Sequence, residues 1–302
     1  MDLSIIIVSF NTKQLLTDCL SSIKDAVRNL SADRQDINTE IFVVDNNSSD
    51  GTTTMIRKDY PQVKLIANKV NLGFSKANNQ ALKKAKGKYV LILNPDTRLM
   101  PNTLKEMIHF MDKHQDIAVS TCRVELANGS LDRDCRRHFP TPWRAFCHFS
   151  NLSKIFKDSK IFDQYYMGYL PQNSEHEIDS CVGAFMMVRQ SAIKKVGYFD
   201  EDFFFYGEDL DWCWRFKEAG YKIVYTPITK IIHYKGAASG MKPSSKHLSA
   251  ATRESKKKAL KESTRAMELF YKKHYLNKYP FLITWLVIFG IKLLGQIRLL
   301  KA

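Results

Sequence analysis

The sequence lacks several features that would assign it to a common protein class. Its six cysteines form no Cys-x-x-Cys pair and have no histidine at a spacing suited to structural zinc, so we expect reduced, buried thiols. The chain enters an apolar stretch directly after Asp2, without a basic region or a cleavage site, which predicts a strand and a cytosolic protein. No glycine-rich basic loop precedes the first helix, which argues against a nucleotidyltransferase.

A long uninterrupted apolar segment is also missing. The C-terminal run from Phe281 to Ile291 has eleven residues before Lys292 interrupts it, whereas a membrane-spanning helix needs about 20. Trp285 and the flanking basic residues favour a helix lying in the headgroup region of an anionic membrane. The alternative is a helix packed on the main domain or in a dimer, and the sequence leaves open whether the chain dimerises.

Excess positive charge is absent from most of the chain. The net charge is +15, from 46 basic and 31 acidic residues. From Met241 onward there are 14 basic and 3 acidic residues, which leaves 32 basic and 28 acidic residues in the first 240. A basic nucleic-acid-binding protein is therefore an alternative without a stacking platform or a binding motif to support it. We expect no nucleic-acid partner and instead an anionic membrane surface, contacted through residues 249–302.

The first hundred residues alternate short β-branched runs with helical patterns. Strands are predicted at "SIIIVSF", "EIFVVD", "KLIA" and "KYVLIL", with helices over residues 12–30, from about Asp50, and over 75–87. This order predicts an α/β fold with a mostly parallel sheet, whose ligands bind beyond the carboxyl ends of the strands. Further strands are predicted at "IDSCVGAFMMV" and "KIVYTPITKIIHY".

The last sixty residues have a different pattern. Apolar residues at helical spacing over 249–279 predict an amphipathic helix with a lysine-rich face. We therefore expect two domains, a catalytic domain over residues 1–240 and a basic helical extension over residues 241–302 that associates with a membrane.

Polar clusters follow three of the predicted strands. In "VVDNNSSDG", Asp45 at a strand end has the chemistry to accept the N3–H of uracil or thymine, although a helix N-cap explains the same residues. In "NLGFSKANN", Gly73 allows close backbone approach beside a helix N-terminus. In "NPDT", Pro95 fixes the backbone and leaves Asp96 free to bind a divalent cation on a diphosphate, or simply to close a turn.

An acidic stretch, "FFFYGEDLDWCWR", lies beside unusual apolar content. Glu208, Asp209 and Asp211 would be costly there unless they are hydrogen-bonded, paired or used in chemistry. Asp211 and Arg215 have the spacing of a helical ion pair, which is the structural explanation we prefer for both. The aromatic residues predict a floor for a sugar ring. Arg136 and Arg137, in "DRDCRRHFPTPWRAF", are candidates for the border of an acceptor site.

The order of these motifs, over roughly residues 3–240, resembles that of family-two inverting glycosyltransferases of the GT-A fold. The set comprises "SFN", "VVDNNSSDG", "NLGFSKANN", "NPDT", "VGAFMMVR", "FFFYGEDLDWCWR" and "IIHYKGAASG". Within the family it is most similar to the bacterial rhamnosyltransferase branch. The resemblance implies transfer of L-rhamnose from dTDP-L-rhamnose to a glycolipid or polysaccharide acceptor in cell-envelope glycan synthesis, at the cytoplasmic face of the inner membrane. Transfer of another sugar from a UDP or GDP donor is the alternative.

The resemblance also implies a nucleotide site. The residues it assigns to nucleotide binding at the strand ends and loops are Ser9, Phe10, Asn11, Asp45, Asn47, Asn71, Gly73 and Asn94. Asn94 stands where the family commonly has the first aspartate of Asp-x-Asp. The resemblance therefore implies that a side-chain amide, and not a carboxylate, faces the ribose here.

A metal site and a catalytic base complete the implied assignments. Asp96 and His233 would bind Mn²⁺ or Mg²⁺, and imidazole suits Mn²⁺ better. Lys235 and Ser239, in the loop after His233, would close over the diphosphate. Asp209 would take the proton of the acceptor hydroxyl, with Glu208 orienting the acceptor or the loop.

Overall fold

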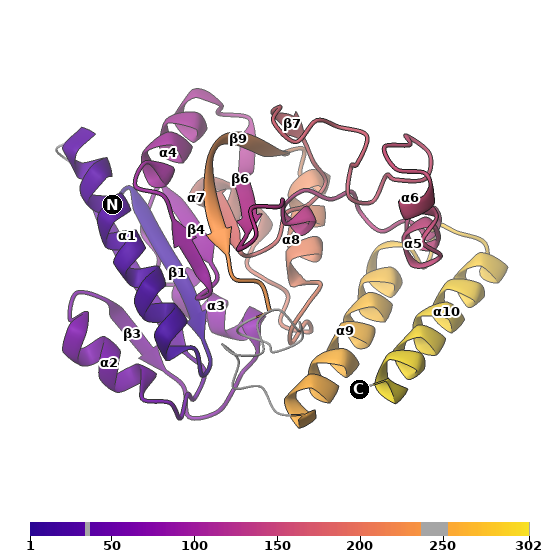
Figure 1. Cartoon of the computed structure of the whole chain (residues 1–302), viewed down its shortest axis with the longest axis horizontal. Coiled ribbons are helices and arrows are strands. Elements are labelled where there is room, and N and C mark those ends of the chain that lie inside the picture. Colours follow the sequence, from indigo (N-terminus) through magenta and orange to yellow (C-terminus); the bar gives the residue numbers. More distant parts are fainter. Residues whose placement is uncertain (34–36, 237–252, 302) are drawn as a thin grey trace.

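The computed structural model describes residues 1–33, 37–236 and 253–301, whose strands form one mixed sheet (Figure 1). The spatial order is β3-β2-β1-β4-β8-β6-β9-β5, with β7 paired to β9. The strands are β1 (Leu3–Ser9), β2 (Thr39–Asp45), β3 (Lys64–Ala67), β4 (Tyr89–Leu93), β5 (Thr97–Leu99), β6 (Ile117–Leu126), β7 (His176–Glu177), β8 (Phe185–Arg189) and β9 (Lys222–His233).

The N-terminal half of the sheet is parallel, as predicted. Strand β1 pairs with β2 and β4, and β2 pairs with β3, all in parallel. The apolar runs of β1, β2 and β4 are buried because helices cover the sheet on both sides, whereas the edge strand β3 is at most partly buried. The carboxyl ends of β1, β2 and β4 therefore meet at one edge, where Ser9 lies opposite Asp45.

The other half departs from the predicted mostly parallel arrangement. Strand β8 is antiparallel to both β4 and β6, and β5 is antiparallel to β9, whereas β6 and β9 are parallel. The short β5 follows β4 closely in sequence but pairs with β9, at the end of the sheet away from β3. The pairing of Thr97 with His233 brings the "NPDT" turn beside the end of β9.

The predicted strand over residues 178–188 is shorter in the structure. Strand β8 begins only at Phe185, because the preceding residues bond elsewhere. Ser180 forms an isolated bridge with Arg137, and a side chain at Gly183 would meet the ring of Phe74 at 3.1 Å.

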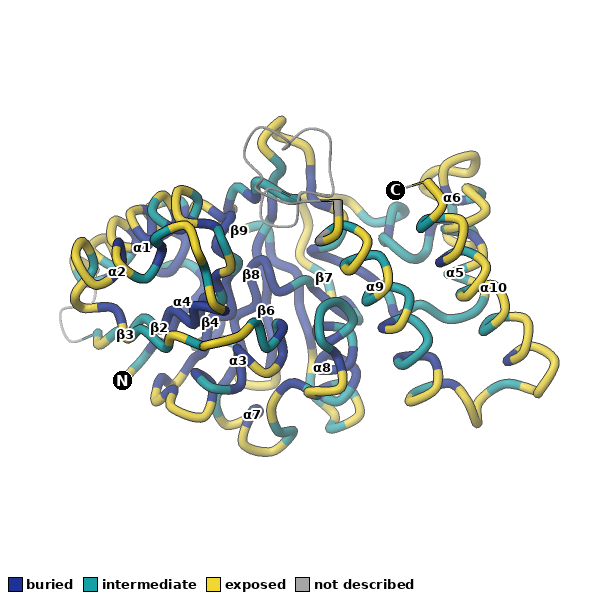
Figure 2. Tube along the Cα trace, turned by 90° about the horizontal axis from the view of Figure 1, so that it is seen from below, coloured by how far each residue is buried: buried dark blue, intermediate teal, exposed yellow. Residues whose placement is uncertain are grey.

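Helices cover both faces of the sheet (Figure 2). Helices α1 and α4 pack together on one face, and α3, α7 and α8 lie on the other. The helices of this main body are α1 (Lys13–Asp33), α2 (Thr52–Asp59), α3 (Phe74–Leu82), α4 (Thr103–Lys113), α7 (Gln190–Val196) and α8 (Glu208–Glu218). The segment between β6 and β8 adds η1 (Arg133–Cys135), α5 (Pro142–Phe149) and α6 (Leu152–Ile155). All six cysteines are free and buried, as expected.

Two C-terminal helices pack beside this body, α9 (Arg253–His274) and α10 (Phe281–Leu300). Helix α9 contacts α8, and Phe270 on α9 packs against Phe139 and Trp214. His274 Nε2 lies 2.9 Å from Asp211 Oδ1, which adds a polar contact to this packing. Helix α10 packs on α9 and leaves many large apolar side chains exposed.

Candidate active site

A cavity of about 1450 Å³ opens at the carboxyl edge of the sheet. Most of the predicted site residues line it, namely Phe10, Asn11, Asn71, Gly73, Asn94, Asp96, Glu208, Asp209, His233 and Lys235. Its volume exceeds the roughly 300–1000 Å³ of a typical small-molecule site. Three further candidates, Ser9, Asp45 and Asn47, lie at the same strand ends but outside its lining, and Ser239 lies outside the described residues.

Asp45 is the buried carboxylate at the end of β2. Its Oδ2 accepts a hydrogen bond from the Ser48 amide at 2.9 Å, whereas Oδ1 is buried and accepts none from the described residues. An orphaned buried acceptor is costly unless a ligand supplies the donor. The turn after β2 is held to the turn after β1, because the Ser49 amide donates to Asn11 Oδ1 at 2.8 Å.

The "NLGF" segment forms one wall of the cavity together with the aromatic run before α8. Gly73 has a φ of +83°, and a Cβ there would lie 2.4 Å from the Phe204 carbonyl oxygen. The Phe74 amide donates to that carbonyl at 2.7 Å. The close approach that Gly73 permits is thus to the backbone at Phe204.

Asn46 is a residue of this wall that sequence reasoning missed. It is buried, its Nδ2 donates to the Gly73 carbonyl at 2.9 Å, and its Oδ1 accepts from Asn68 Nδ2 at 3.0 Å. It lines the cavity and fixes the position of the loop. Its place between Asp45 and Asn47 offered no sequence signal beyond a turn-forming residue.

Asp96 and His233 lie side by side at the junction of β5 and β9. Both are buried, and Asp96 Oδ1 lies 3.4 Å from His233 Nε2. Asp96 Oδ1 accepts no hydrogen bond from the described residues. The backbone holds the pair together, since the Tyr234 amide donates to the Asp96 carbonyl at 2.8 Å.

Asp132 supports this pair from behind and was not among the predicted residues. Its Oδ2 lies 2.9 Å from His233 Nδ1, and its carboxylate also pairs with Lys235, which contacts Asp134 as well. Burial favours a neutral imidazole, but the charge of Asp96 and the hydrogen bond to Asp132 raise the pKa of His233 to about 9. Lys235, predicted for the diphosphate, is held by these two carboxylates in the structure.

The donor set at Asp96 and His233 fits a divalent cation in part. A free carboxylate oxygen faces an imidazole nitrogen whose other nitrogen is oriented by Asp132, as in many metal sites. Within the described ranges, no three His, Cys, Asp or Glu side chains are grouped closely enough to hold a metal alone. An ion here would take its remaining ligands from a phosphate or from water.

Glu208 and Asp209 begin α8 and face the same cavity. Glu208 Oε2 is buried without a hydrogen-bond partner among the described residues. Burial, reinforced by the negative charge of Asp209, raises the pKa of Glu208 to about 8. The expected ion pair further along the helix is confirmed, because Arg215 Nε lies 2.8 Å from Asp211 Oδ2.

Arg137 is the cation that pairs with Asp209. Its Nη2 lies 2.7 Å from Asp209 Oδ2, and both side chains are almost fully buried. Arg136 points elsewhere and donates to the carbonyls of Leu170 and Pro171, so only Arg137 reaches the cavity.

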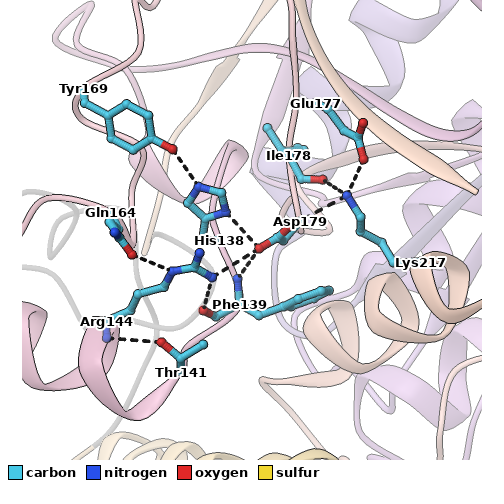
Figure 3. A network of polar contacts seen from close by, with 10 residues as sticks. All are labelled: His138, Phe139, Thr141, Arg144, Gln164, Tyr169, Glu177, Ile178, Asp179 and Lys217. Carbon is cyan, nitrogen blue, oxygen red and sulfur yellow. Dashed lines mark hydrogen bonds and ion pairs between the residues drawn. The ribbon is translucent and has the colours of Figure 1, made fainter. Parts of the chain in front are cut away.

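A polar network around Asp179 fixes the segment that carries Arg137 (Figure 3). Asp179 Oδ2 lies 2.8 Å from His138 Nδ1 and accepts from the Phe139 amide at 3.0 Å and from Arg144 Nη1 at 3.4 Å. His138 Nε2 in turn lies 2.9 Å from the Tyr169 hydroxyl. These contacts join α5 to the segment before β8, so both are positioned together beside the base candidate.

Comparison with solved structures defines the class of the fold. The chain superposes on the mannosyltransferase PcManGT from Pyrobaculum calidifontis, solved with GDP-Man and Mn²⁺, with a TM-score of 0.54 and 15% identity over 99% of this chain and 86% of that one. The protein therefore has the GT-A fold of glycosyltransferases, as the motif order implied.

The family follows from the sequence matches. The chain matches the glycosyl transferase family 2 over residues 4–197 and belongs to that family, whose members typically invert the anomeric configuration. It is 32% identical to rhamnosyltransferase WbbL of Escherichia coli over 70% of this chain and 78% of the relative. It is 27% identical to the N-acetylglucosaminyl-diphospho-decaprenol L-rhamnosyltransferase of Mycobacterium tuberculosis, over 70% and 71%.

Proposed function

We propose that the protein transfers L-rhamnose from dTDP-L-rhamnose to a lipid-linked acceptor in the synthesis of a cell-envelope glycan. The observation that carries this proposal is that Asp96, His233 and Asp209 line one cavity in a family 2 glycosyltransferase. Similarity to two rhamnosyltransferases supports the sugar. Asp45 Oδ1, an orphaned buried acceptor at the end of β2, supports a pyrimidine with an N3–H donor.

Asp96 and His233 would hold a divalent cation together with phosphate or water ligands, and Mn²⁺ is better suited than Mg²⁺ to the imidazole. When bound, it would offset the charge of the nucleoside diphosphate as the sugar leaves. The chain's own residues prepare this site, since Asp132 orients the ring of His233 and the turn after β4 presents Asp96.

Asp209 is the proposed catalytic base. The acceptor hydroxyl forms a bond to the anomeric carbon as the bond to the diphosphate oxygen breaks, and its proton passes to the Asp209 carboxylate. Arg137 holds that carboxylate in place. Glu208, whose pKa of about 8 keeps it mostly protonated at neutral pH, is suited to donate a hydrogen bond that orients the acceptor.

The C-terminal helices supply the proposed attachment to the membrane. In the described part of the chain, α10 is the one helix long and apolar enough to span a bilayer by length and composition. Its exposed side chains include Phe281, Trp285 and Phe289, and lysines of α9 are exposed nearby. We place the protein at the cytoplasmic face of the bacterial inner membrane, with α10 in the headgroup region.

Calorimetric titration of the nucleotide tests this function. We expect dTDP to bind in the presence of Mn²⁺ more tightly than UDP or GDP, and Asp96→Ala to weaken the metal-dependent part of the binding. Tighter binding of GDP, or identical affinities with and without metal, would overturn the donor assignment or the metal assignment respectively.

A further inference from the structure

The cavity has a second, apolar branch that the catalytic chemistry does not use. It extends from the site between α5, α9 and α10. Its lining comes from all three helices and is mostly apolar, including Phe146, Phe149, Met267, Val287, Ile291 and Leu294. Lys258, Glu262 and Ser263 of α9 add polar groups to it. We call this branch the α5–α9–α10 groove.

Helix α10 forms one wall of the groove and is bound to the protein along one face only. Its buried residues are Thr284 and Gly295. The Thr284 hydroxyl lies 3.2 Å from the Tyr271 hydroxyl, and a Cβ on Gly295 would lie 2.6 Å from the Thr264 side chain. Both contacts join α10 to α9, so α9 holds α10 in place beside the groove.

Gly290 shows how open the groove is. It lines the cavity, and a Cβ built on it would meet no atom within 4 Å. A wall of apolar side chains around such a space is unfavourable in water. The space therefore suits a hydrocarbon occupant.

Two cations of the C-terminal helices line the cavity, Lys258 on α9 and Arg298 on α10, and Lys258 Nζ lies 4.7 Å from the centre of the Phe204 ring. Arg298 is half-buried, its guanidinium lies 5.5 Å from the centre of the Phe149 ring, and burial lowers its pKa. No carboxylate of the described residues forms an ion pair with it. Arg298 is near the C-terminal end of α10, and this end lies nearer to the sheet than the N-terminal end does (Figures 1 and 2).

We propose that the α5–α9–α10 groove binds the isoprenoid chain of the acceptor lipid, with Arg298 facing its phosphate. This inference rests on the proposed function. Continuity with the catalytic cavity means that a chain in the groove presents its head group toward Asp209. From Arg298 the chain follows Leu294, Ile291 and Val287 along α10 toward the half of the helix that exposes Phe281 and Trp285. That half is where a lipid tail would leave for the bilayer.

Binding of undecaprenyl phosphate to the full chain in detergent tests the proposal. Gly290→Phe places a ring in the open part of the groove and is expected to weaken binding at least tenfold. Gln296→Phe adds the same ring to α10 at an exposed position outside the cavity lining and should leave binding unchanged. Equal binding by Gly290→Phe, or equal losses in both variants, would overturn the proposal.

Further binding measurements distinguish the possible ligands of the groove and check that the variants are folded. Arg298→Gln should weaken binding of undecaprenyl phosphate about tenfold but leave binding of undecaprenol unchanged. An equal loss of affinity for both lipids would show that Arg298 does not bind the phosphate. In a competition experiment, phosphatidylglycerol should displace the bound undecaprenyl phosphate less effectively than unlabelled undecaprenyl phosphate does. Equal displacement by the two lipids would show a general lipid site and contradict the isoprenoid assignment. Affinity for dTDP with Mn²⁺ reports on the proposed function separately, and all three variants should retain it.

Discussion

The two ends of the cavity are built in opposite ways. At the strand end, charged side chains are buried and several are paired with one another, as Asp132 is with His233 and Arg137 with Asp209. At the helical end, apolar side chains of α5 and α10 surround open space and have few protein partners. The difference fits the proposed division of roles, in which preorganised charges serve the reaction and the apolar surface binds the lipid.

Removing the base should affect the strand end most. Asp209→Asn keeps the size and a hydrogen bond to Arg137 but accepts no proton, so kcat should fall by roughly 10²–10⁴-fold. Nucleotide affinity and binding of undecaprenyl phosphate should stay within about twofold. Transfer of radiolabelled rhamnose, measured beside both affinities, checks this, and full turnover in the variant would remove Asp209 as the base.

Loosening the support of His233 should have a smaller effect at the same end. Asp132→Asn should weaken Mn²⁺ binding by about 10–100-fold, the usual loss when the partner of a metal-binding histidine is changed. Asp134→Asn is the matched control, because Asp134 also pairs with Lys235, whereas the hydrogen bond to His233 Nδ1 comes from Asp132. Mn²⁺ titration by calorimetry measures both, and equal affinities in the two variants would argue against the role of Asp132.

Deleting α10 should affect only the helical end. Loss of residues 279–302 should lower sedimentation with anionic liposomes at least tenfold, because the exposed apolar residues and three basic residues go with it. Nucleotide affinity should not change. Unchanged lipid binding would end the membrane assignment.

The smallest predicted effect concerns the buried Glu208. Its pKa is raised from 4.5 to about 8 in the folded protein, so its carboxyl costs no stability below pH 4.5 and lowers stability as the pH rises toward 8. Glu208→Gln does not titrate. Its melting temperature should rise relative to the unchanged protein between pH 5 and 8, by at least about 2–4 °C, the shift that about 1 kcal/mol produces. Parallel melting curves across this range would contradict the buried, protonated state.

The parallel half of the fold could be predicted from the sequence because each element carried its own local pattern. The alternation of apolar runs and helices over the first hundred residues corresponds closely to β1–β4 and α1–α3. The strand β6 went unpredicted, and residues 178–184 were wrongly expected to be extended. Their conformation depends on long-range bonds, such as that between Ser180 and Arg137, which local composition does not reveal.

The candidate site shows the same limit. Asp96, His233 and Asp209 were identified by motif order, and the structure brings them to one cavity. Asp132 and Asn46 act on these elements from positions set by strand register and loop packing, so no spacing pointed to them. The groove was equally hidden, since it forms only when α5, far from α9 and α10 in sequence, lies beside them.

Pulsed electron paramagnetic resonance of the Mn²⁺ and dTDP complex tests the central claim most directly. If Asp96 and His233 hold the metal, the spectrum should show coupling of Mn²⁺ to a ¹⁴N nucleus of imidazole. The coupling should disappear in His233→Ala and persist in His148→Ala, which removes another histidine of the same cavity. Coupling that survives in His233→Ala, or is absent from the unchanged protein, would contradict the account.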